Sequence, residues 1–280
     1  GIILFFCSRD KINWEIKRKI EVKEEFNTFE CPDLFYLERV PIISISMINE
    51  DVKNDDKEDN YKSGYYFMDG ETIEDYELGE LHEWDKGFDF YAPQTFIDRN
   101  GRVILIALMG IPSAEYINPT KELGWQHCLT IPRELKLSEG KIHQSPINEI
   151  EMLRKNKQIK EITDELEITL KNTSEIILSI PNESKECNIV INNCLELIYD
   201  GNKQVFIMEF INELGYGRTK RKLNIKQLLE MRILLDSSSI EIFLNGGEEV
   251  LTSRIFKKEQ ECQFEIRCIN ASLVMWEIEV

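Results

Sequence analysis

The stretch from Leu229 to Leu244 reads Leu-Glu-Met-Arg-Ile-Leu-Leu-Asp-Ser-Ser-Ser-Ile-Glu-Ile-Phe-Leu, and Asn245-Gly246-Gly247 follows it directly. In both Leu229 to Leu235 and Ile240 to Leu244, alternate positions place apolar residues on one face of a strand. Asn and Gly tolerate the positive φ that tight hairpin turns demand. The stretch therefore predicts antiparallel strands with a hairpin turn at Asn245-Gly246-Gly247.

The same alternation reaches further along the chain. Gln263 to Cys268 reads Gln-Phe-Glu-Ile-Arg-Cys, which again places apolar residues on one face. We interpret about the last 120 residues as an antiparallel β-sandwich, because short alternating strands separated by turns are typical of that architecture. Its expected core comprises Leu234, Ile242, Phe243, Phe264, Ile266 and Trp276.

The first half is also rich in predicted strands, but longer and more polar loops separate them. Glu50 to Asn60 is highly charged and lacks periodicity, which predicts a solvated loop. A calcium loop is the alternative there, but no register supplies the Gly and Glu that an EF-hand requires at its sixth and twelfth positions. Glu71 to Asp85 carries seven acids among Tyr76, Leu78, Leu81 and Trp84, and it predicts a strand and turn on an exposed edge.

One segment favours a helix. From Pro146 to Lys155, the apolar residues Ile147, Ile150 and Leu153 recur every three residues. We expect this short helix to join two domains, a first over residues 1–150 and a sandwich over residues 151–280.

Length and charge exclude several classes. A chain of 280 residues is long enough for one large or two ordinary domains. Its 34 Lys plus Arg against 51 Asp plus Glu give a net charge of −17, which repels phosphate backbones and anionic lipid headgroups. No apolar run approaches the roughly 18 residues that span a bilayer. We expect a soluble globular protein with no nucleic-acid or membrane partner.

The seven cysteines are an odd number and form no Cys-x-x-Cys pair. This argues against a disulfide framework and a zinc site, so we expect reduced thiols, a cytoplasmic location and no metal. Three segments match the Asn-x-Ser/Thr pattern of glycan acceptors, at Asn172, Asn182 and Asn270. We interpret them as chance matches, because the pattern is common in an Asn-rich chain, and glycosylation is the alternative.

Glu30 stands out among the ionisable residues. It lies in Thr28-Phe29-Glu30-Cys31-Pro32-Asp33-Leu34-Phe35, where Phe29 and Cys31 flank it and Pro32 fixes the backbone. Desolvation there raises the pKa of a carboxyl toward the range in which it donates protons, so the segment indicates a general acid. Asp33 is its candidate polar companion. An ordinary strand-end Glu and routine Asp-Pro turn chemistry are the alternatives.

A second cluster, Gly87-Phe88-Asp89-Phe90-Tyr91-Ala92-Pro93-Gln94-Thr95-Phe96, interleaves aromatic residues with Asp89 and Gln94. Sugar sites use aromatic faces for stacking and carboxylates or amides for hydroxyl groups. Core aromatics are the alternative. His127, in Trp125-Gln126-His127, lacks a His or Cys neighbour at metal spacing, which favours a structural role.

Motifs for other enzyme classes are missing from the sequence. It contains no Gly-x-Ser-x-Gly, no phosphate-binding Gly-x-x-x-x-Gly-Lys-Ser/Thr, and no Gly-x-Gly-x-x-Gly after a strand. Serine hydrolases, P-loop enzymes and Rossmann enzymes are therefore disfavoured.

Taken together, the segments resemble glycoside hydrolase family 32, the sucrose-6-phosphate hydrolase, invertase and levanase family. The matching text comprises Phe29 to Phe35, Asp89 to Phe96, Gly124 to His127 with Leu129 to Leu135, Ser239 to Asn245, and Leu251 to Arg254. The resemblance covers nearly the whole chain in the family's order.

This resemblance implies a five-bladed β-propeller followed by a β-sandwich, here an all-β chain with a partial propeller. It also implies retaining hydrolysis of β-fructofuranosides, in which one carboxylate attacks the fructosyl carbon and a second acts as acid and base. Glu30 matches the acid/base, and no cofactor is implied. The substrate-binding assignments are Cys31, Asp33, Asp89, Tyr91 and Gln94.

The family's nucleophile segment, Trp-Met-Asn-Asp-Pro-Asn-Gly, and its Arg-Asp-Pro motif do not occur in these 280 residues. We therefore expect about the first two blades to be missing and the chain to be inactive alone. Its expected partners are a fructose-containing sugar and the missing amino-terminal segment. Leu108, where many members have Trp, and Lys62, where Gln is common, are departures that bear on sugar contacts.

The rival interpretation is a non-catalytic carbohydrate-binding or assembly module derived from a truncated or decayed relative. The sequence upstream in the gene distinguishes the two, since the missing motifs in frame restore the enzyme. Sucrose, sucrose 6-phosphate and fructans remain open as substrates.

Overall fold

The computed structural model describes residues 1–49, 60–111, 114–257 and 261–279. Within these ranges the regular structure is almost entirely strand, with the short 3-10 helices η2 (Pro119–Leu123), η3 (Asn148–Leu153) and η4 (Glu213–Gly215). The predicted all-β class is confirmed. The predicted solvated loop at Glu50 to Asn60 falls outside the described residues, except for Asn60 itself.

The chain forms two compact units, one of residues 1–84 and 91–107 and the other of residues 85–90 and 108–280. The division into domains at residues 150 and 151 stays a prediction. The strands between residues 2 and 109 are β1 (Ile2–Cys7), β2 (Glu15–Glu21), β3 (Thr28–Leu37), β4 (Val40–Ile48), β5 (Tyr61–Asp69), β6 (Glu77–Glu83), β7 (Tyr91–Ile97) and β8 (Val103–Met109), and we call them the early strands.

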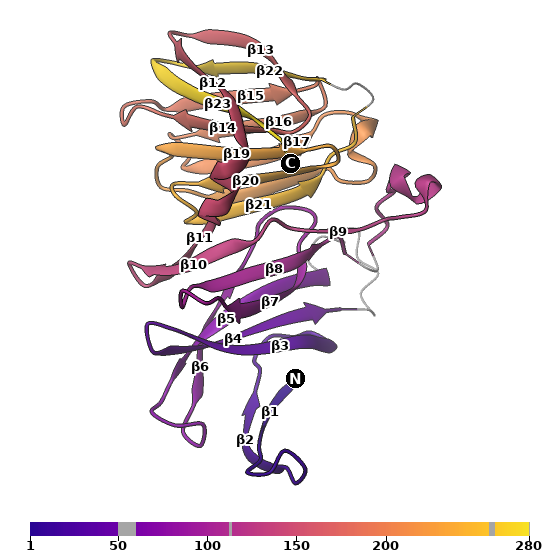
Figure 1. Ribbon diagram of the computed structural model, residues 1–280, viewed down its shortest axis with the longest axis vertical. Helices are drawn as coiled ribbons and strands as arrows, with labels where there is room; N and C mark the ends of the chain where they lie inside the picture. Colours follow the sequence, from indigo (N-terminus) through magenta and orange to yellow (C-terminus); the bar gives the residue numbers. More distant parts are fainter. Residues whose placement is uncertain (50–59, 112–113, 258–260, 280) are drawn as a thin grey trace. The chain divides into compact units, whose positions relative to one another are not determined.

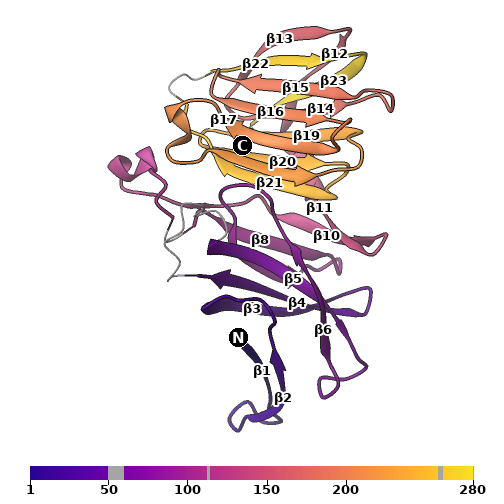
Figure 2. The same cartoon turned by 180° about the vertical axis from the view of Figure 1, so that it is seen from behind.

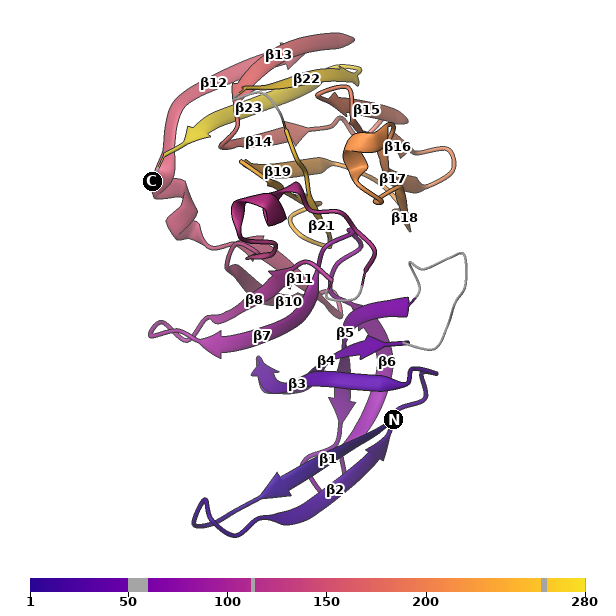
Figure 3. The ribbon, with the colours of Figure 1, turned by 90° about the vertical axis from the view of Figure 1, so that its right-hand side faces the viewer.

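The early strands pair in antiparallel fashion. β1 and β2 form a two-stranded ribbon, which Figure 3 shows as the extended hairpin at the N-terminus. A four-stranded sheet has the order β3-β4-β5-β6, so each strand pairs with its neighbour in the sequence. β7 and β8 belong to a sheet of order β11-β10-β8-β7, in which β9 also pairs with β8.

β6 is an edge strand of the four-stranded sheet, as the acidic Glu71 to Asp85 segment predicts. Its acids stay at least partly exposed, whereas Tyr76 and Trp84, which flank the strand, are buried. Charged residues along an exposed edge discourage pairing with other chains. The apolar side of the sheet packs with Ile3 and Phe5 of β1 into one core.

Two six-stranded sheets form the layers of the sandwich, with orders β12-β23-β14-β19-β20-β21 and β13-β22-β15-β16-β17-β18 (Figures 1 and 2). The later strands are β9 (Cys128–Leu129), β10 (Arg133–Ser138), β11 (Lys141–Pro146), β12 (Arg154–Ile162), β13 (Glu165–Lys171), β14 (Ser174–Ser179), β15 (Glu186–Ile191), β16 (Leu195–Asp200), β17 (Val205–Phe210), β18 (Lys220–Asn224), β19 (Glu230–Asp236), β20 (Ser239–Leu244), β21 (Glu249–Arg254), β22 (Glu261–Cys268) and β23 (Ala271–Ile278).

The main core lies between these two sheets and includes the predicted residues Ile242, Phe264 and Ile266. Leu234 and Phe243 are also buried, but they belong to a smaller cluster with Ile150. The prediction of Trp276 as a core residue is wrong. Trp276 is only half-buried, because it alternates with the buried Met275 and points to the other side of its strand.

The Asn245-Gly246-Gly247 hairpin is confirmed. All three residues have positive φ, between 49° and 87°, and they connect β20 to β21. The predicted helix from Pro146 to Lys155 is wrong in type and length, since the structure has a 3-10 helix from Asn148 to Leu153. In a 3-10 helix side chains three residues apart eclipse, which accounts for the three-residue apolar spacing.

Candidate active site

A β-bulge on β3 positions Glu30. Glu30 lies opposite Ser46 of β4 and Asp33 lies opposite Ser44, so Cys31 and Pro32 together face a single residue. Cys31 has a φ of 50°, a left-handed conformation that is uncommon for a residue with a side chain. Pro32 has no N–H to contribute to the strand ladder. Bulges re-aim side chains next to active sites, and this one sets the direction of Glu30.

β7 begins with a similar arrangement. Ala92 has a φ of 48° and, like Cys31, precedes a proline, Pro93. The Ala92 N–H donates to Oγ of Ser46 at 3.1 Å, and Ser46 also exchanges a hydrogen bond of 2.8 Å with Ser63. The left-handed residue of β7 is therefore anchored on the strand that pairs with Glu30.

Direct contacts tie the start of β7 to the bulge. Oη of Tyr91 donates to Oε2 of Glu30 at 2.6 Å. Nε2 of Gln94 donates to the carbonyl oxygen of Cys31 at 3.1 Å. The N–H of Thr95 donates to Oδ2 of Asp33 at 2.7 Å. Sequence reasoning singled out Glu30, Cys31, Asp33, Tyr91 and Gln94, and the structure brings all five together.

The electrostatics of the site favour these contacts. Burial and, secondarily, the hydrogen bond to Glu30 raise the pKa of Tyr91 above its usual value near 10. The phenol therefore stays protonated and donates to the carboxylate. Partial burial and the charge of Glu30 likewise raise the pKa of the Cys31 thiol, which remains neutral.

Glu30 itself is exposed. The prediction that Phe29 and Cys31 shield its carboxylate from water is therefore wrong. The physical reason is the alternation of the strand. Phe29 packs against the core beneath one face of the sheet, whereas Glu30 lies on the opposite face beside the exposed Cys31 and Pro32. Neighbours in sequence therefore do not cover the carboxylate.

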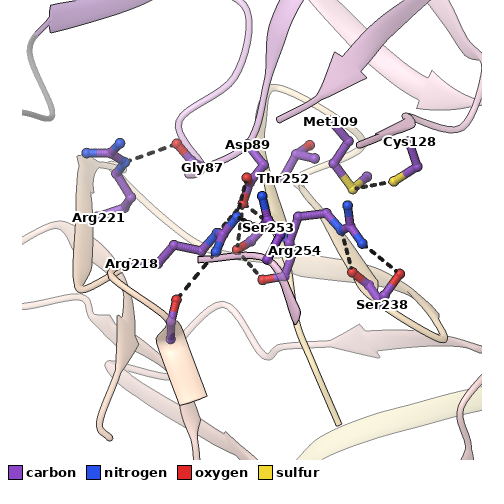
Figure 4. A network of polar contacts seen from close by, with 12 residues as sticks. Gly87, Asp89, Met109, Cys128, Arg218, Arg221, Ser238, Thr252, Ser253 and Arg254 are labelled. Atoms are coloured by element: carbon purple, nitrogen blue, oxygen red, sulfur yellow. Dashed lines mark hydrogen bonds and ion pairs between the residues drawn. The ribbon is translucent and has the colours of Figure 1, made fainter. Parts of the chain in front are cut away.

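Asp89 belongs to the second compact unit. Its side chain is fully buried, and its oxygens accept from Nε and Nη2 of Arg218 at 2.6 and 2.7 Å (Figure 4). Oδ2 also accepts from the N–H of Arg254 at 2.8 Å. In this geometry Asp89 presents no oxygen to a sugar, and its contacts are those of a structural ion pair.

Arg133, in the Leu129 to Leu135 motif, has a similar structural environment. Its guanidinium is completely buried and donates to Glu241 at 2.6 Å and to Asp85 at 3.1 Å. Part of the motif text quoted above therefore encodes buried ion pairs in the second unit.

Sequence reasoning missed the buried serines beneath the site. Ser44 and Ser46 are almost completely buried, and Oγ of Ser44 accepts from Nε1 of Trp84 at 2.9 Å. Their signal was present as two polar residues in the apolar run Pro41-Ile-Ile-Ser-Ile-Ser-Met47. Polar residues at buried positions need partners, so such a pattern indicates a network.

No group of three metal-ligating side chains occurs among residues 1–49, 60–111, 114–257 and 261–279. Burial, followed by the charge of Arg254, lowers the pKa of His127, and its ring lies where a Cβ on Gly110 would fall. This fits the structural role expected for His127.

Nζ of Lys62 lies 3.4 Å from Oε1 of Glu83. In the same described ranges, no helix is long and apolar enough to cross a membrane.

Glycoside hydrolases generally use two carboxylates, one of which acts as a general acid. In this all-β chain, Glu30 is a carboxylate that lies on a strand bulge and accepts a hydrogen bond from a phenol. Residues 1–146 match the model for the glycosyl hydrolases family 32 N-terminal domain, and residues 149–273 match the model for the family's C-terminal domain. The chain belongs to glycosyl hydrolase family 32.

Curated relatives are similar along most of this chain. The sucrose-6-phosphate hydrolase of Staphylococcus xylosus is 33% identical over 92% of this chain and 56% of its own length. That of Bacillus subtilis is 34% identical over 81% of this chain and 49% of its own length. The chain spans about half the length of these relatives.

Solved structures agree with this assignment. A GH32 beta-fructofuranosidase of Bombyx mori has a TM-score of 0.84 and 25% identity, and the match covers 100% of this chain and 61% of that one. A variant of the same enzyme was solved in complex with sucrose. The sucrose-6-phosphate hydrolase of Lactobacillus gasseri, with a TM-score of 0.82 and 19% identity, supports the fold.

Proposed function

We propose that this chain carries the acid/base part of the active site of a β-fructofuranosidase that acts on sucrose or sucrose 6-phosphate. The observation that supports this most directly is the hydrogen bond from Tyr91 to Glu30 at the bulge of β3. Relatives named sucrose-6-phosphate hydrolase and a Bombyx mori homologue solved with sucrose support the substrate class.

In the proposed mechanism, Glu30 first donates a proton to the oxygen of the leaving sugar while a nucleophilic carboxylate attacks the fructosyl carbon. Glu30 then removes a proton from the water that cleaves the fructosyl-enzyme intermediate. Retention of configuration requires the two carboxyl groups about 5 Å apart. Because Tyr91 donates to Oε2, the transferable proton resides on Oε1, the oxygen left free of that bond.

In this proposal Gln94 and Asp33 position the acid/base, whereas the sequence predicted that they bind substrate. Their contacts are with the backbone of Cys31 and Thr95, so they fix the two left-handed turns against each other. We propose that they position Glu30 and that Tyr91 orients its carboxylate. We leave Asp89 out of the sugar site, because Arg218 occupies both its oxygens.

The nucleophile belongs to sequence that these 280 residues do not contain, since they hold no Asn-Asp-Pro-Asn or Arg-Asp-Pro. We propose that β3 to β6 and the sheet of β7, β8, β10 and β11 are blades of a five-bladed propeller, and that β1 and β2 belong to a third. The chain alone is then inactive, because general acid assistance supplies only about 10²- to 10⁴-fold of a glycosidase's acceleration.

The test is reconstitution. The chain is mixed with a separately expressed amino-terminal segment from the full gene, and fructose release from sucrose and from sucrose 6-phosphate is measured. We expect background release from the chain alone, recovery on mixing, and loss of that recovery in Glu30→Gln. The matched control is Glu38→Gln, an exposed carboxylate in the turn that follows β3.

Robust Glu30-dependent release by the isolated chain would mean that another carboxylate serves as the nucleophile. Sugar binding without any turnover on mixing would instead favour the non-catalytic module.

A further inference from the structure

Two thiols lie opposite each other inside the sandwich. Cys187 is the second residue of β15 and Cys268 is the last residue of β22, and the antiparallel register pairs them directly. Figure 2 shows these two strands side by side. Each is 2% exposed, and both belong to the main core. A hydrogen bond links the two thiols.

The backbone pattern defines the type of this cross-strand pair. The N–H of Asn192 donates to the carbonyl of Gln263 at 2.9 Å, which makes that position a hydrogen-bonded pair. Pair types alternate at every residue of an antiparallel ladder, so Cys187 and Cys268, five residues away, form a non-hydrogen-bonded pair. The backbone of Cys268 is consistent with this pair type, because its N–H donates to the carbonyl oxygen of Asp164, on the side of β22 away from β15.

This pair type brings the two residues close enough to be bridged. Opposite Cα atoms of a non-hydrogen-bonded pair lie about 4.5 Å apart, and disulfides span Cα separations of about 4.4–6.8 Å. Both side chains also project toward the same core, so no strand has to rotate. A cross-strand disulfide therefore requires little movement of the backbone.

We propose that Cys187 and Cys268 form an oxidation site, which closes to a cross-strand disulfide when the protein meets a small-molecule disulfide such as oxidised glutathione. The pair lies near the end of both strands, and the next residue, Ile269, is 60% exposed. Strand ends open locally at low free-energy cost, which admits the oxidant to thiols that are otherwise buried.

The chemistry balances as two thiol–disulfide exchanges. The sulfur of Cys268 attacks oxidised glutathione, forming a mixed disulfide and releasing one glutathione thiolate. The sulfur of Cys187 then attacks Sγ of Cys268 and releases the second. The protein loses two electrons and two protons, and the oxidant is reduced to two glutathione molecules. Cys268 attacks first, because hydrogen bonds from Cys187 and Ser184 hold the pKa of its thiol below the ordinary value.

Cys194 and Cys262 supply a matched comparison within the same core. Both are buried, and burial raises the pKa of each thiol to about 11. Cys194 lies at the end of the turn between β15 and β16, immediately before Leu195, and the register pairs Cys262 with Leu170 of β13, so Cys194 is not the cross-strand partner of Cys262. Burial alone is thus shared by both pairs, whereas direct opposition in register is specific to Cys187 and Cys268.

The experiment uses the 280-residue chain, first reduced and then incubated with oxidised glutathione. Free thiols are blocked with N-ethylmaleimide, and proteolytic peptides are analysed by mass spectrometry without reduction. We expect one internal bridge, between the peptides that contain Cys187 and Cys268. The thermal unfolding midpoint should rise by roughly 5–10 °C and return on reduction, because a cross-link that closes a long loop restrains the unfolded chain.

The bridge and the shift should persist in Cys194→Ala/Cys262→Ala and disappear in Cys187→Ala/Cys268→Ala. A bridge between other cysteines, or glutathione adducts without any internal bridge, would overturn the proposal. If the second double variant fails to fold, the peptide map of the unaltered chain decides the question. None of these measurements involves a sugar, so the outcome is independent of the proposed function.

Discussion

Oη of Tyr91 donates a 2.6 Å hydrogen bond to Oε2 of Glu30, across 61 positions of sequence. The contact joins the first residue of β7 to the bulge of β3, and each partner is followed by a left-handed residue and a proline. Two local distortions of the backbone therefore meet at one carboxylate. Strained backbone of this kind persists only where the surrounding contacts hold it, so loss of these contacts should disturb the position of Glu30.

Tyr91→Phe in the chain reconstituted with its amino-terminal segment should lower kcat about ten- to hundredfold and change KM little. Hydrogen bonds to charged groups are worth about 1.5–3 kcal/mol, and each 1.36 kcal/mol is a factor of ten in rate. Steady-state kinetics with sucrose and sucrose 6-phosphate test this. The control is Tyr36→Phe, which removes a hydroxyl that pairs with Tyr76 in the same unit. A raised KM with an unchanged kcat would favour direct substrate binding by Tyr91.

The stabilisation that Tyr91 provides should depend on pH at the alkaline end. Burial, and then Glu30, raise the pKa of Tyr91 in the folded chain, so the folded state holds this proton more tightly than the unfolded state. Its contribution is therefore complete below pH about 10 and is lost as pH rises through the higher folded value. The free energy of unfolding is measured with urea for the unaltered chain and for Tyr91→Phe, at pH 8 and above pH 10. The difference between the two proteins should be smaller above pH 10 than at pH 8. A difference that widens with pH would contradict the shift.

How far the sequence predicts this protein depends on which interactions fix each residue. Local patterns were sufficient for the alternation that buries Ile242 and for the turn at Asn245, because both depend on neighbours in the chain. They failed for Trp276 and for the desolvation of Glu30, where the face of the strand decides. The role of Asp89 depends on Arg218, which is 129 positions away in the sequence, and no local pattern predicts a contact between these two residues.

Asp89→Asn should destabilise the folded chain by about 3–5 kcal/mol, because it leaves the buried guanidinium of Arg218 without a counter-charge. The control Glu165→Gln, at an exposed pair with Arg267, should cost at most about 1 kcal/mol. Urea denaturation measures both. If Asp89→Asn kept full stability and raised KM for the sugar in the reconstituted enzyme, the original assignment of Asp89 to substrate binding would stand.

Limited proteolysis tests the predicted boundary between the first domain and the sandwich, which we expect between residues 146 and 163, because the short helical segment there joins residues 1–150 to residues 151–280. Within it, Met152 lies in the 3-10 helix η3 and is 78% exposed. A protease of low specificity, such as subtilisin, should therefore cut the folded chain near residue 152 and leave two stable fragments, identified by mass spectrometry. Stable fragments that divide near residue 60 or 210, with no cleavage near 152, would show that the domains are divided elsewhere.

Substitutions at Cys31 separate the conformation of the bulge from the chemistry of its thiol. Cys31 has a φ of 50°, and a β-branched side chain is strongly disfavoured in that region. Cys31→Val should therefore destabilise the chain by about 1–3 kcal/mol and lower kcat in the reconstituted enzyme, since the bulge that directs Glu30 shifts. Cys31→Ala, which tolerates the same φ about as well as Cys, should leave stability nearly unchanged. Urea denaturation and steady-state kinetics on both variants make the comparison. A thiol that contacts substrate predicts instead that Cys31→Ala raises KM as much as Cys31→Val does, and that result would restore Cys31 to the sugar site.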